Sequence, residues 1–226
     1  MLLAIDTATR MLSLAVHDGN QILAEQTWQA PNNHTEILAP AIDTLATHAG
    51  VSLTDLTALA VVHGPGSYTG VRIGVAMAKG LAAARGLPVV GVTTLDAVAA
   101  GQPKHKGTLI AIVSAGRGRV IAGRYRWTLD DGYVPRGGSK LLKWAELFET
   151  IDSEVTLAGE INERGWAALD DARTSNLELN VHFADPAHSL RRAGFVAKTA
   201  WARLNAVSPS DFDAAKIVPL YMNTID

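Results

Sequence analysis

An α/β fold with mixed sheets flanked by helices is predicted by three features of the sequence. The chain opens with apolar segments of strand length joined by short connections, which indicates antiparallel neighbours. Strand-like and helix-like segments then alternate up to residue 100, which is typical of helices that cross over a sheet. A shorter pass of hairpin and helices follows the linker at residues 101–107, so we expect two similar lobes.

The first lobe is expected to begin with strands over residues 2–5, 12–16 and 22–28. Asn33 is a suitable cap for a helix whose third position is Glu36, as in a capping box. Apolar residues then recur with helical period until Gly50 ends the helix. The rest of the lobe alternates a strand at 57–62, a helix at 69–85, a strand at 87–92 and a helix at 94–100.

The second lobe is expected to repeat this plan in a shorter form. The predicted elements are strands at 109–113 and 120–127, a helix at 140–150, a strand at 155–158, a helix at 161–170, a weak strand at 178–183 and a long helix at 190–206. We therefore assign residues 1–100 to the first lobe, joined by the C-terminal segment 207–226, and residues 101–206 to the smaller second lobe.

Composition excludes several classes of protein. Hydrophobic residues make up 48% of the chain and charged residues 19%, so a packed core is expected. The net charge of −2 argues against a protein devoted to binding phosphate backbones. The absence of cysteine removes disulfides, thiolate metal ligands and cysteine nucleophiles, and it fits a reducing cytoplasm. The sequence has neither a signal peptide pattern nor a stretch of ~20 apolar residues, so we expect a cytoplasmic protein with no membrane partner.

The glycine-rich stretch His63–Gly74 joins a buried strand to a helix. Backbone N–H groups at such a helix N-terminus are able to bind an anion. The glycine spacing matches neither G-x-G-x-x-G nor G-x-x-x-x-G-K-[ST], so we interpret the glycines as permitting a tight turn and close helix–sheet packing. Ser67 does not match the G-x-S-x-G nucleophile pattern, which argues against serine-hydrolase chemistry.

Asp6 and His34 are the candidates for ligand chemistry in the first lobe. Asp6 ends the first strand, and a carboxylate there is suited to a magnesium-bound phosphate, although a turn-capping role is the simpler interpretation. His34 lies at a helix start. Because the seven histidines form no H-x-x-x-H pair, we expect no metal site.

Basic residues gather around the linker and the hairpin of the second lobe, with Tyr125 and Trp127 among them. They are Lys104, Lys106, Arg117, Arg119, Arg124 and Arg126. A solvated hairpin face is the preferred interpretation, and an RNA contact is the alternative.

Three stretches together resemble one known family. They are Ala4-Ile5-Asp6-Thr7-Ala8-Thr9, then His34-Thr35-Glu36 with Leu38 and Pro40, then His63–Gly74 with Ala78-Lys79-Gly80-Leu81. Gly91-Val92-Thr93-Thr94-Leu95 and Pro219-Leu220-Tyr221 add to the set. In these residues the chain is similar to the TsaB family, also called YeaZ, whose members are paralogues of the carbamoyl-transferring subunit TsaD.

The resemblance implies an actin-like fold of the sugar kinase and Hsp70 type (ASKHA) with two similar lobes. It implies a non-catalytic subunit that is required for threonylcarbamoyl transfer to adenosine in tRNAs reading codons that begin with A. The implied partners are TsaD, in a heterodimer, and TsaE, a P-loop ATPase, in a ternary complex. Such a chain would form a homodimer when alone and would contact tRNA only indirectly.

The resemblance also implies where partners and ligands bind. The partner interface would lie on the helices after His34 and after Gly70, whose small-residue face Gly70, Gly74, Ala78 and Ala82 permits close approach of another helix. The expected interface residues are His34, Glu36, Leu38, Ser67, Tyr68, Thr69, Arg72 and Ile73. The expected nucleotide-binding residues are Asp6, Thr7 and Thr9. We expect no catalytic residue and no cofactor, with ATP or ADP and magnesium held only at the complex interface.

An enzyme is the alternative, either an actin-like ATPase or phosphotransferase that uses Asp6, or a metallopeptidase. The first needs a second acidic anchor. The family often has Asp-Ala-Arg in the second-lobe hairpin turn, whereas this chain has Ser114-Ala115-Gly116. The second needs paired metal ligands, and the positions similar to the metal histidines of TsaD are Thr94 and Val98. Both departures favour the non-catalytic role.

Overall fold

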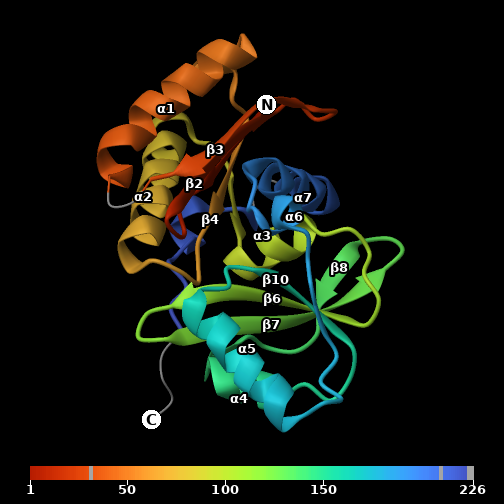
Figure 1. Ribbon diagram of the computed structural model, residues 1–226. Coiled ribbons are helices and arrows are strands. Elements are labelled where there is room, and N and C mark those ends of the chain that lie inside the picture. Colours follow the sequence, from red (N-terminus) through yellow and green to blue (C-terminus); the bar gives the residue numbers. More distant parts are fainter. Residues whose placement is uncertain (31–32, 209–210, 223–226) are drawn as a thin grey trace. The chain divides into compact units, whose positions relative to one another are not determined.

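The computed structural model describes residues 1–30, 33–208 and 211–222, so the predicted tail segment 207–226 lies partly outside the described residues. The chain forms two compact units, shown in Figure 1. The first unit consists of Met1–Ala97 and Arg191–Tyr221, and the second of Val98–Leu190 with Met222 at the end of the chain. The second unit is therefore inserted into the first.

The first unit contains a five-stranded mixed sheet with β1 at its centre. In spatial order its strands are β3 (Ile22–Gln29), β2 (Met11–His17), β1 (Leu2–Asp6), β4 (Ala58–Val62) and β5 (Val89–Val92). The chain forms β1, β2 and β3 as an antiparallel meander, and β4 and β5 add in parallel to β1. β1 and β4 are buried along their whole length, as expected of strands covered on both faces.

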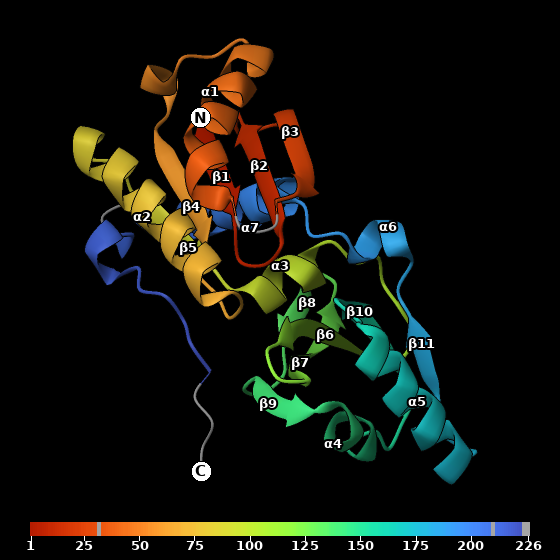
Figure 2. The ribbon, with the colours of Figure 1, turned by 60° about the vertical axis from the view of Figure 1, so that its left-hand side comes forward.

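Helices cover both faces of this sheet (Figures 1 and 2). α1 (His34–Ala49) and α2 (Tyr68–Arg85) pack side by side on one face, and α7 (Ala193–Ala206) packs on the other. Gly50 and Gly86 end α1 and α2 in the left-handed conformation, as predicted. Asn33 makes no side-chain capping hydrogen bond, so the predicted capping box is not formed.

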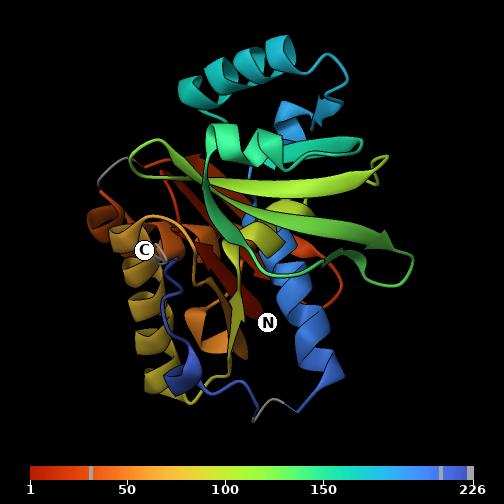
Figure 3. The ribbon, with the colours of Figure 1, turned by 90° about the horizontal axis from the view of Figure 1, so that it is seen from below.

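The segment after α7 returns along α2 (Figure 3). It contains the short helix η3 (Ala214–Lys216), and its Phe212 carbonyl accepts the Val89 N–H. The backbone N–H of Leu220 donates to the His63 carbonyl at 2.7 Å. Gly64, at φ +110°, makes this approach possible, because a Cβ there would lie 2.5 Å from the Leu220 oxygen.

The second unit repeats the strand order of the first. In spatial order its strands are β11 (Val181–Phe183), β10 (Val155–Gly159), β6 (Thr108–Ala115), β7 (Arg119–Thr128) and β8 (Gly132–Pro135), and β9 (Lys140–Lys143) also pairs with β7. The central strand β6, like β1, has an antiparallel neighbour that follows it and a parallel neighbour formed later. The expectation of two similar lobes is confirmed.

Among the described residues, four helices belong wholly or partly to the second unit. They are α3 (Thr94–Ala100), which spans the boundary, α4 (Trp144–Glu149), α5 (Glu163–Ser175) and α6 (Pro186–Ser189). α4 and α5 pack against each other (Figure 2). Trp144, Leu147 and Phe148 of α4 lie in the core of this unit.

The structure differs from the predicted elements in several places. The helix predicted at 140–150 is a strand, β9, followed by the shorter α4. The helix predicted at 190–206 as part of the second lobe begins at Ala193, and it packs on the sheet of the first unit. β8 was not expected. The boundary that we placed at residue 206 therefore differs from the one in the structure, which lies at Arg191.

Within the described residues, no helix combines the length and the hydropathy needed to cross a bilayer.

Candidate functional site

The glycine-rich stretch packs the start of α2 directly on the turn between β1 and β2. A Cβ on Gly66 would lie 2.1 Å from the Ala8 carbonyl oxygen, and one on Gly70 would lie 2.2 Å from that of Thr7. The Thr7 hydroxyl donates to the Gly70 carbonyl at 2.7 Å. The start of α2 is thus in close contact with the backbone of this turn, which agrees with the close-packing interpretation of the glycines.

Asp6 lies under the same turn, and its carboxylate is paired with Arg191. The Arg191 Nε donates to Asp6 Oδ2 at 2.7 Å, and the Ala8 N–H donates to Oδ1 at 2.9 Å. The Asp6 and Arg191 side chains are 1% and 3% exposed. The guanidinium also donates to the Thr9 hydroxyl at 2.8 Å. Asp6, Thr7 and Thr9, which the resemblance assigns to a nucleotide, are therefore all buried and hydrogen-bonded within the chain.

Arg191 was missed by the sequence analysis. It stands 185 residues from Asp6 and begins the segment that returns to the first unit. No local pattern around Arg191 marks it, and only the pairing with a buried carboxylate shows its role.

His34, the first residue of α1, is 7% exposed, and its Nε2 has no hydrogen-bond partner within the described residues. Burial lowers the pKa of His34 below its ordinary value, partly offset by the Thr9 and Met11 backbone and by the Asp6 charge. Burial also lowers the pKa of His17. The pKa of His105 is lowered first by burial and further by the charge of His188. At each of these histidines burial favours the neutral imidazole in the folded chain.

Lowering the pH below about 6.5 is expected to destabilise the fold, because the unfolded chain then binds protons that the folded chain excludes. The contribution of these histidines to the stability of the fold is fully present at a pH above their pKa in the unfolded chain. It is lost as the pH falls through their lower pKa values in the folded chain. Urea denaturation at pH 7.5 and pH 5.5 measures this difference, and the His34→Gln variant is expected to show a smaller one. An equal loss in the variant would show that His34 does not contribute.

The expected partner-interface residues divide into exposed and buried groups. Glu36, Ser67, Tyr68, Thr69 and Arg72 are exposed, and Ile73 is half-buried. His34 and Leu38 are buried within the chain, and their assignment to a partner interface stays a prediction.

The small-residue face of α2 packs within the chain. Gly70, Gly74, Ala78 and Ala82 are buried against the chain's own sheet. A Cβ on Gly74 would lie 2.3 Å from the Thr7 hydroxyl. Spacing by four residues indicates a close-packing face, but it does not identify the partner of that face.

An aromatic and cationic cluster forms the exposed surface at the N-terminal end of α2. The Tyr68 and Tyr221 rings stack at 5.0 Å, and Arg72 Nη1 donates to the Tyr68 hydroxyl at 2.6 Å. Tyr68 is 58% exposed and Tyr221 is 40% exposed. Tyr221 was not among the expected interface residues. The docked tail brings it beside Tyr68, from 153 positions further along the chain.

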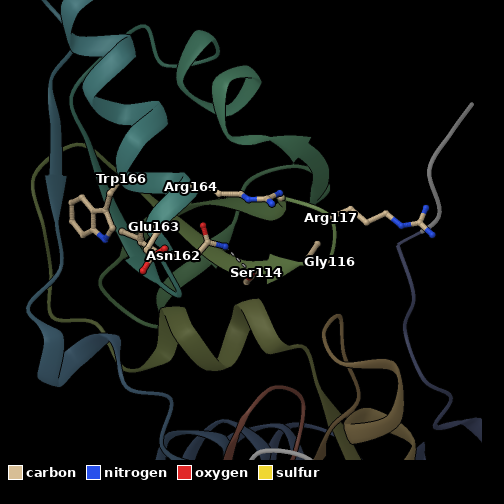
Figure 4. A pocket seen from close by; sticks show the side chains of 10 residues that line it. Ser114, Gly116, Arg117, Asn162, Glu163, Arg164 and Trp166 are labelled. Atoms are coloured by element: carbon tan, nitrogen blue, oxygen red, sulfur yellow. Dashed lines mark hydrogen bonds between the residues drawn. The ribbon is translucent and has the colours of Figure 1, made fainter.

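The corresponding place in the second unit is an open pocket of 640 Å³ between the β6–β7 turn and the start of α5. Figure 4 shows Asn162 directed at Ser114, to which its amide donates at 3.2 Å, and Arg117 extending away from them. Glu163 is the single carboxylate among the residues that line this pocket. At the position in the turn where the family often has an aspartate, this chain has the hydroxyl of Ser114.

The His, Asp and Glu side chains that the structure describes do not gather in groups of three suited to a metal ion. The positions compared with metal histidines are Thr94, which is buried, and Val98, which is buried and apolar. The chain's own residues in this region therefore offer no imidazole pair.

Comparisons with known proteins agree with one another. A family model described as "TsaD: tRNA N6-adenosine threonylcarbamoyltransferase" matches residues 21–148. The tRNA threonylcarbamoyladenosine biosynthesis protein TsaB of Bacillus subtilis is 34% identical over 160 residues, 70% of this chain and 70% of that protein. TsaB of Escherichia coli is 40% identical over 127 residues, 55% of this chain and 54% of that protein.

Among solved structures, YeaZ from Pseudomonas aeruginosa matches with a TM-score of 0.76 at 28% identity, covering 98% of this chain and 99% of that one. This match and the strand order shared by the two units identify the actin-like fold. The family model spans more than half of the chain, and the Bacillus subtilis relative exceeds 30% identity over most of both proteins. The chain therefore belongs to the TsaB (YeaZ) family.

Proposed function

We propose that the chain acts in the biosynthesis of threonylcarbamoyladenosine in tRNA as a non-catalytic subunit that pairs with TsaD and supports the binding of TsaE. The observation that carries the non-catalytic role is the Asp6–Arg191 pair. A carboxylate that holds a magnesium-bound phosphate must face its ligand with its negative charge available. Here that charge is neutralised by a buried arginine of the same chain.

The surface around Tyr68, Arg72 and Tyr221 supports the pairing. Tyrosine and arginine are the residue types that carry the most binding energy in protein interfaces. Both tyrosines are exposed although they are stacked, and Glu36 and Thr69 on α1 and α2 are exposed as well. We propose that this face binds TsaD, and that it pairs two copies of the chain when TsaD is absent.

Light scattering on a mixture of the chain with TsaD from the same organism tests the pairing. A one-to-one complex is expected at micromolar concentration, and a dimer is expected for the chain alone. The Arg72→Glu variant is expected to raise the Kd for TsaD by at least about tenfold, because it reverses a central charge and removes the bond to Tyr68.

The matched control is Lys198→Glu, the same charge reversal on α7, which packs on the other face of the sheet. This variant is expected to bind TsaD as the original chain does. Failure of the original chain to form the complex would overturn the pairing. Calorimetric titration with Mg-ATP tests the enzyme alternative: tight binding that is lost in Asp6→Ala would overturn the non-catalytic role.

A further inference from the structure

Three cations line one pocket of the second unit, away from the β6–β7 turn. Arg124 lies on β7, Arg136 directly follows β8, and Lys140 begins β9. The pocket has a volume of 340 Å³, and none of its lining residues carries a carboxylate. Its floor is apolar, formed in part by Ile110 and Leu147.

Strand register brings these charges together. Tyr125 pairs with Pro135 across β7 and β8, and the Arg136 N–H donates to the Arg124 carbonyl at 2.7 Å, so the two arginines are cross-strand neighbours. Lys140 pairs with Ala122, two residues before Arg124 and on the same face of β7. Like charges placed opposite each other destabilise a sheet. The chain keeps this arrangement in a protein whose net charge is negative.

The cations are only partly satisfied within the chain. Arg124 Nη2 donates to the Thr150 carbonyl at 2.6 Å, which fixes the guanidinium at the pocket wall. Within the part of the chain that the structure describes, neither Arg136 nor Lys140 forms an ion pair, and both are exposed. The segment between them, Gly137-Gly138, carries no side chain that would cover the pocket mouth, and a Cβ at either position would meet nothing within 4 Å.

We propose that this pocket binds a phosphate group, held by the Arg124 and Arg136 guanidiniums and the Lys140 ammonium. Guanidiniums match phosphate oxygens in pairs, and an ammonium adds a point charge. A pocket of this size accepts a phosphate with a small attached group. Bound phosphate also relieves the repulsion between the two arginines.

The phosphate has two possible sources, an RNA backbone or a small phosphorylated molecule. The RNA source rests on the proposed function, because it makes the second unit a direct contact for the tRNA. The small-molecule source does not depend on it. The two sources are separated by using two probes, an unmodified tRNA transcript and inorganic phosphate.

The test compares the original chain with the double variant Arg136→Gln/Lys140→Gln. Filter binding measures the tRNA transcript over a series of salt concentrations, and calorimetry measures inorganic phosphate. The double variant is expected to lose at least about tenfold in affinity for one probe. If the tRNA is that probe, the slope of the logarithm of the binding constant against the logarithm of the salt concentration is expected to become less steep. The slope is expected to change by about one for each cation removed.

The matched control is Lys198→Gln/Lys216→Gln, which removes two exposed positive charges outside the pocket. It is expected to bind both probes within about twofold of the original chain, since distant exposed charges are screened. The unfolding midpoint of the pocket variant is expected to be no lower than that of the control, because the variant removes repulsion.

Loss for tRNA assigns the site to an RNA backbone, and loss for inorganic phosphate alone assigns it to a small ligand. Both outcomes support the site. Equal binding by the two double variants, or no binding of either probe by the original chain, would overturn it. Complex formation with TsaD is expected to be unchanged in the pocket variant. Failure of the original chain to pair with TsaD would overturn the proposed function without bearing on the phosphate result.

Discussion

Replacing Arg191 by alanine is expected to lower the free energy of unfolding by about 3–5 kcal/mol, because it leaves the Asp6 carboxylate buried without its counter-charge. Asp6 would keep the Ala8 N–H and lose both contacts with the guanidinium. The Thr9 hydroxyl would lose the hydrogen bond from Arg191 and keep the one from the Met11 N–H. Urea denaturation monitored by tryptophan fluorescence measures the change.

The control for this variant is its neighbour. Arg192 pairs with Glu25, but its side chain is 50% exposed, so Arg192→Ala is expected to cost about 1 kcal/mol or less. The double variant Asp6→Leu/Arg191→Met is expected to recover most of the loss, since an apolar pair of similar volume needs no compensation for buried charge. Equal losses for Arg191→Ala and Arg192→Ala would show that burial of the Asp6–Arg191 pair has no special energetic role.

Two glycine-to-alanine changes in α2 are expected to act in opposite directions. In Gly70→Ala the new Cβ would lie 2.2 Å from the Thr7 carbonyl oxygen, so backbone must move, at a cost of about 1–3 kcal/mol or more. The same movement weakens the Thr7–Gly70 hydrogen bond, which contributes about 0.5–1.5 kcal/mol. Gly80→Ala meets nothing within 4 Å in the same helix and is expected to stabilise the chain by about 0.5–1 kcal/mol.

Denaturant midpoints of the two variants, measured side by side, test this pair. Both variants replace glycine by alanine in the same helix, so helix propensity alone would predict that both are more stable than the original chain. A stabilised Gly70→Ala variant would contradict the close packing of α2 on the β1–β2 turn.

The parts of the fold that depend on local pattern were predictable from the sequence. Gly50 and Gly86 end their helices where expected, because a left-handed residue at a helix end is a local requirement. The segment Lys140–Lys143 was not predictable in the same way. It has two apolar residues between two lysines, and such a short run fits a helix or a strand. Pairing with β7 makes this segment a strand.

The candidate site was less predictable, because its decisive contacts join distant segments. The position of Asp6 at a strand end was evident from the sequence, but its buried ion pair depends on Arg191, which is 185 residues away. Spacing by four residues marked Gly70 and Gly74 as a packing face, and only the structure shows that the chain's own sheet occupies it. Likewise, no pattern near Tyr221 indicates that it stacks on Tyr68.

The insertion of the second unit into the first has a consequence for the order in which the chain is completed on the ribosome. All five strands of the first sheet are synthesised by residue 92, but α7, which covers one of its faces, begins only at Ala193. At ~5–20 residues per second, that face lacks its cover for roughly 5 to 20 seconds. Residues Val98–Leu190, which form most of the second unit, are synthesised without interruption during this interval. The part of the protein that is synthesised first is therefore the part that is finished last.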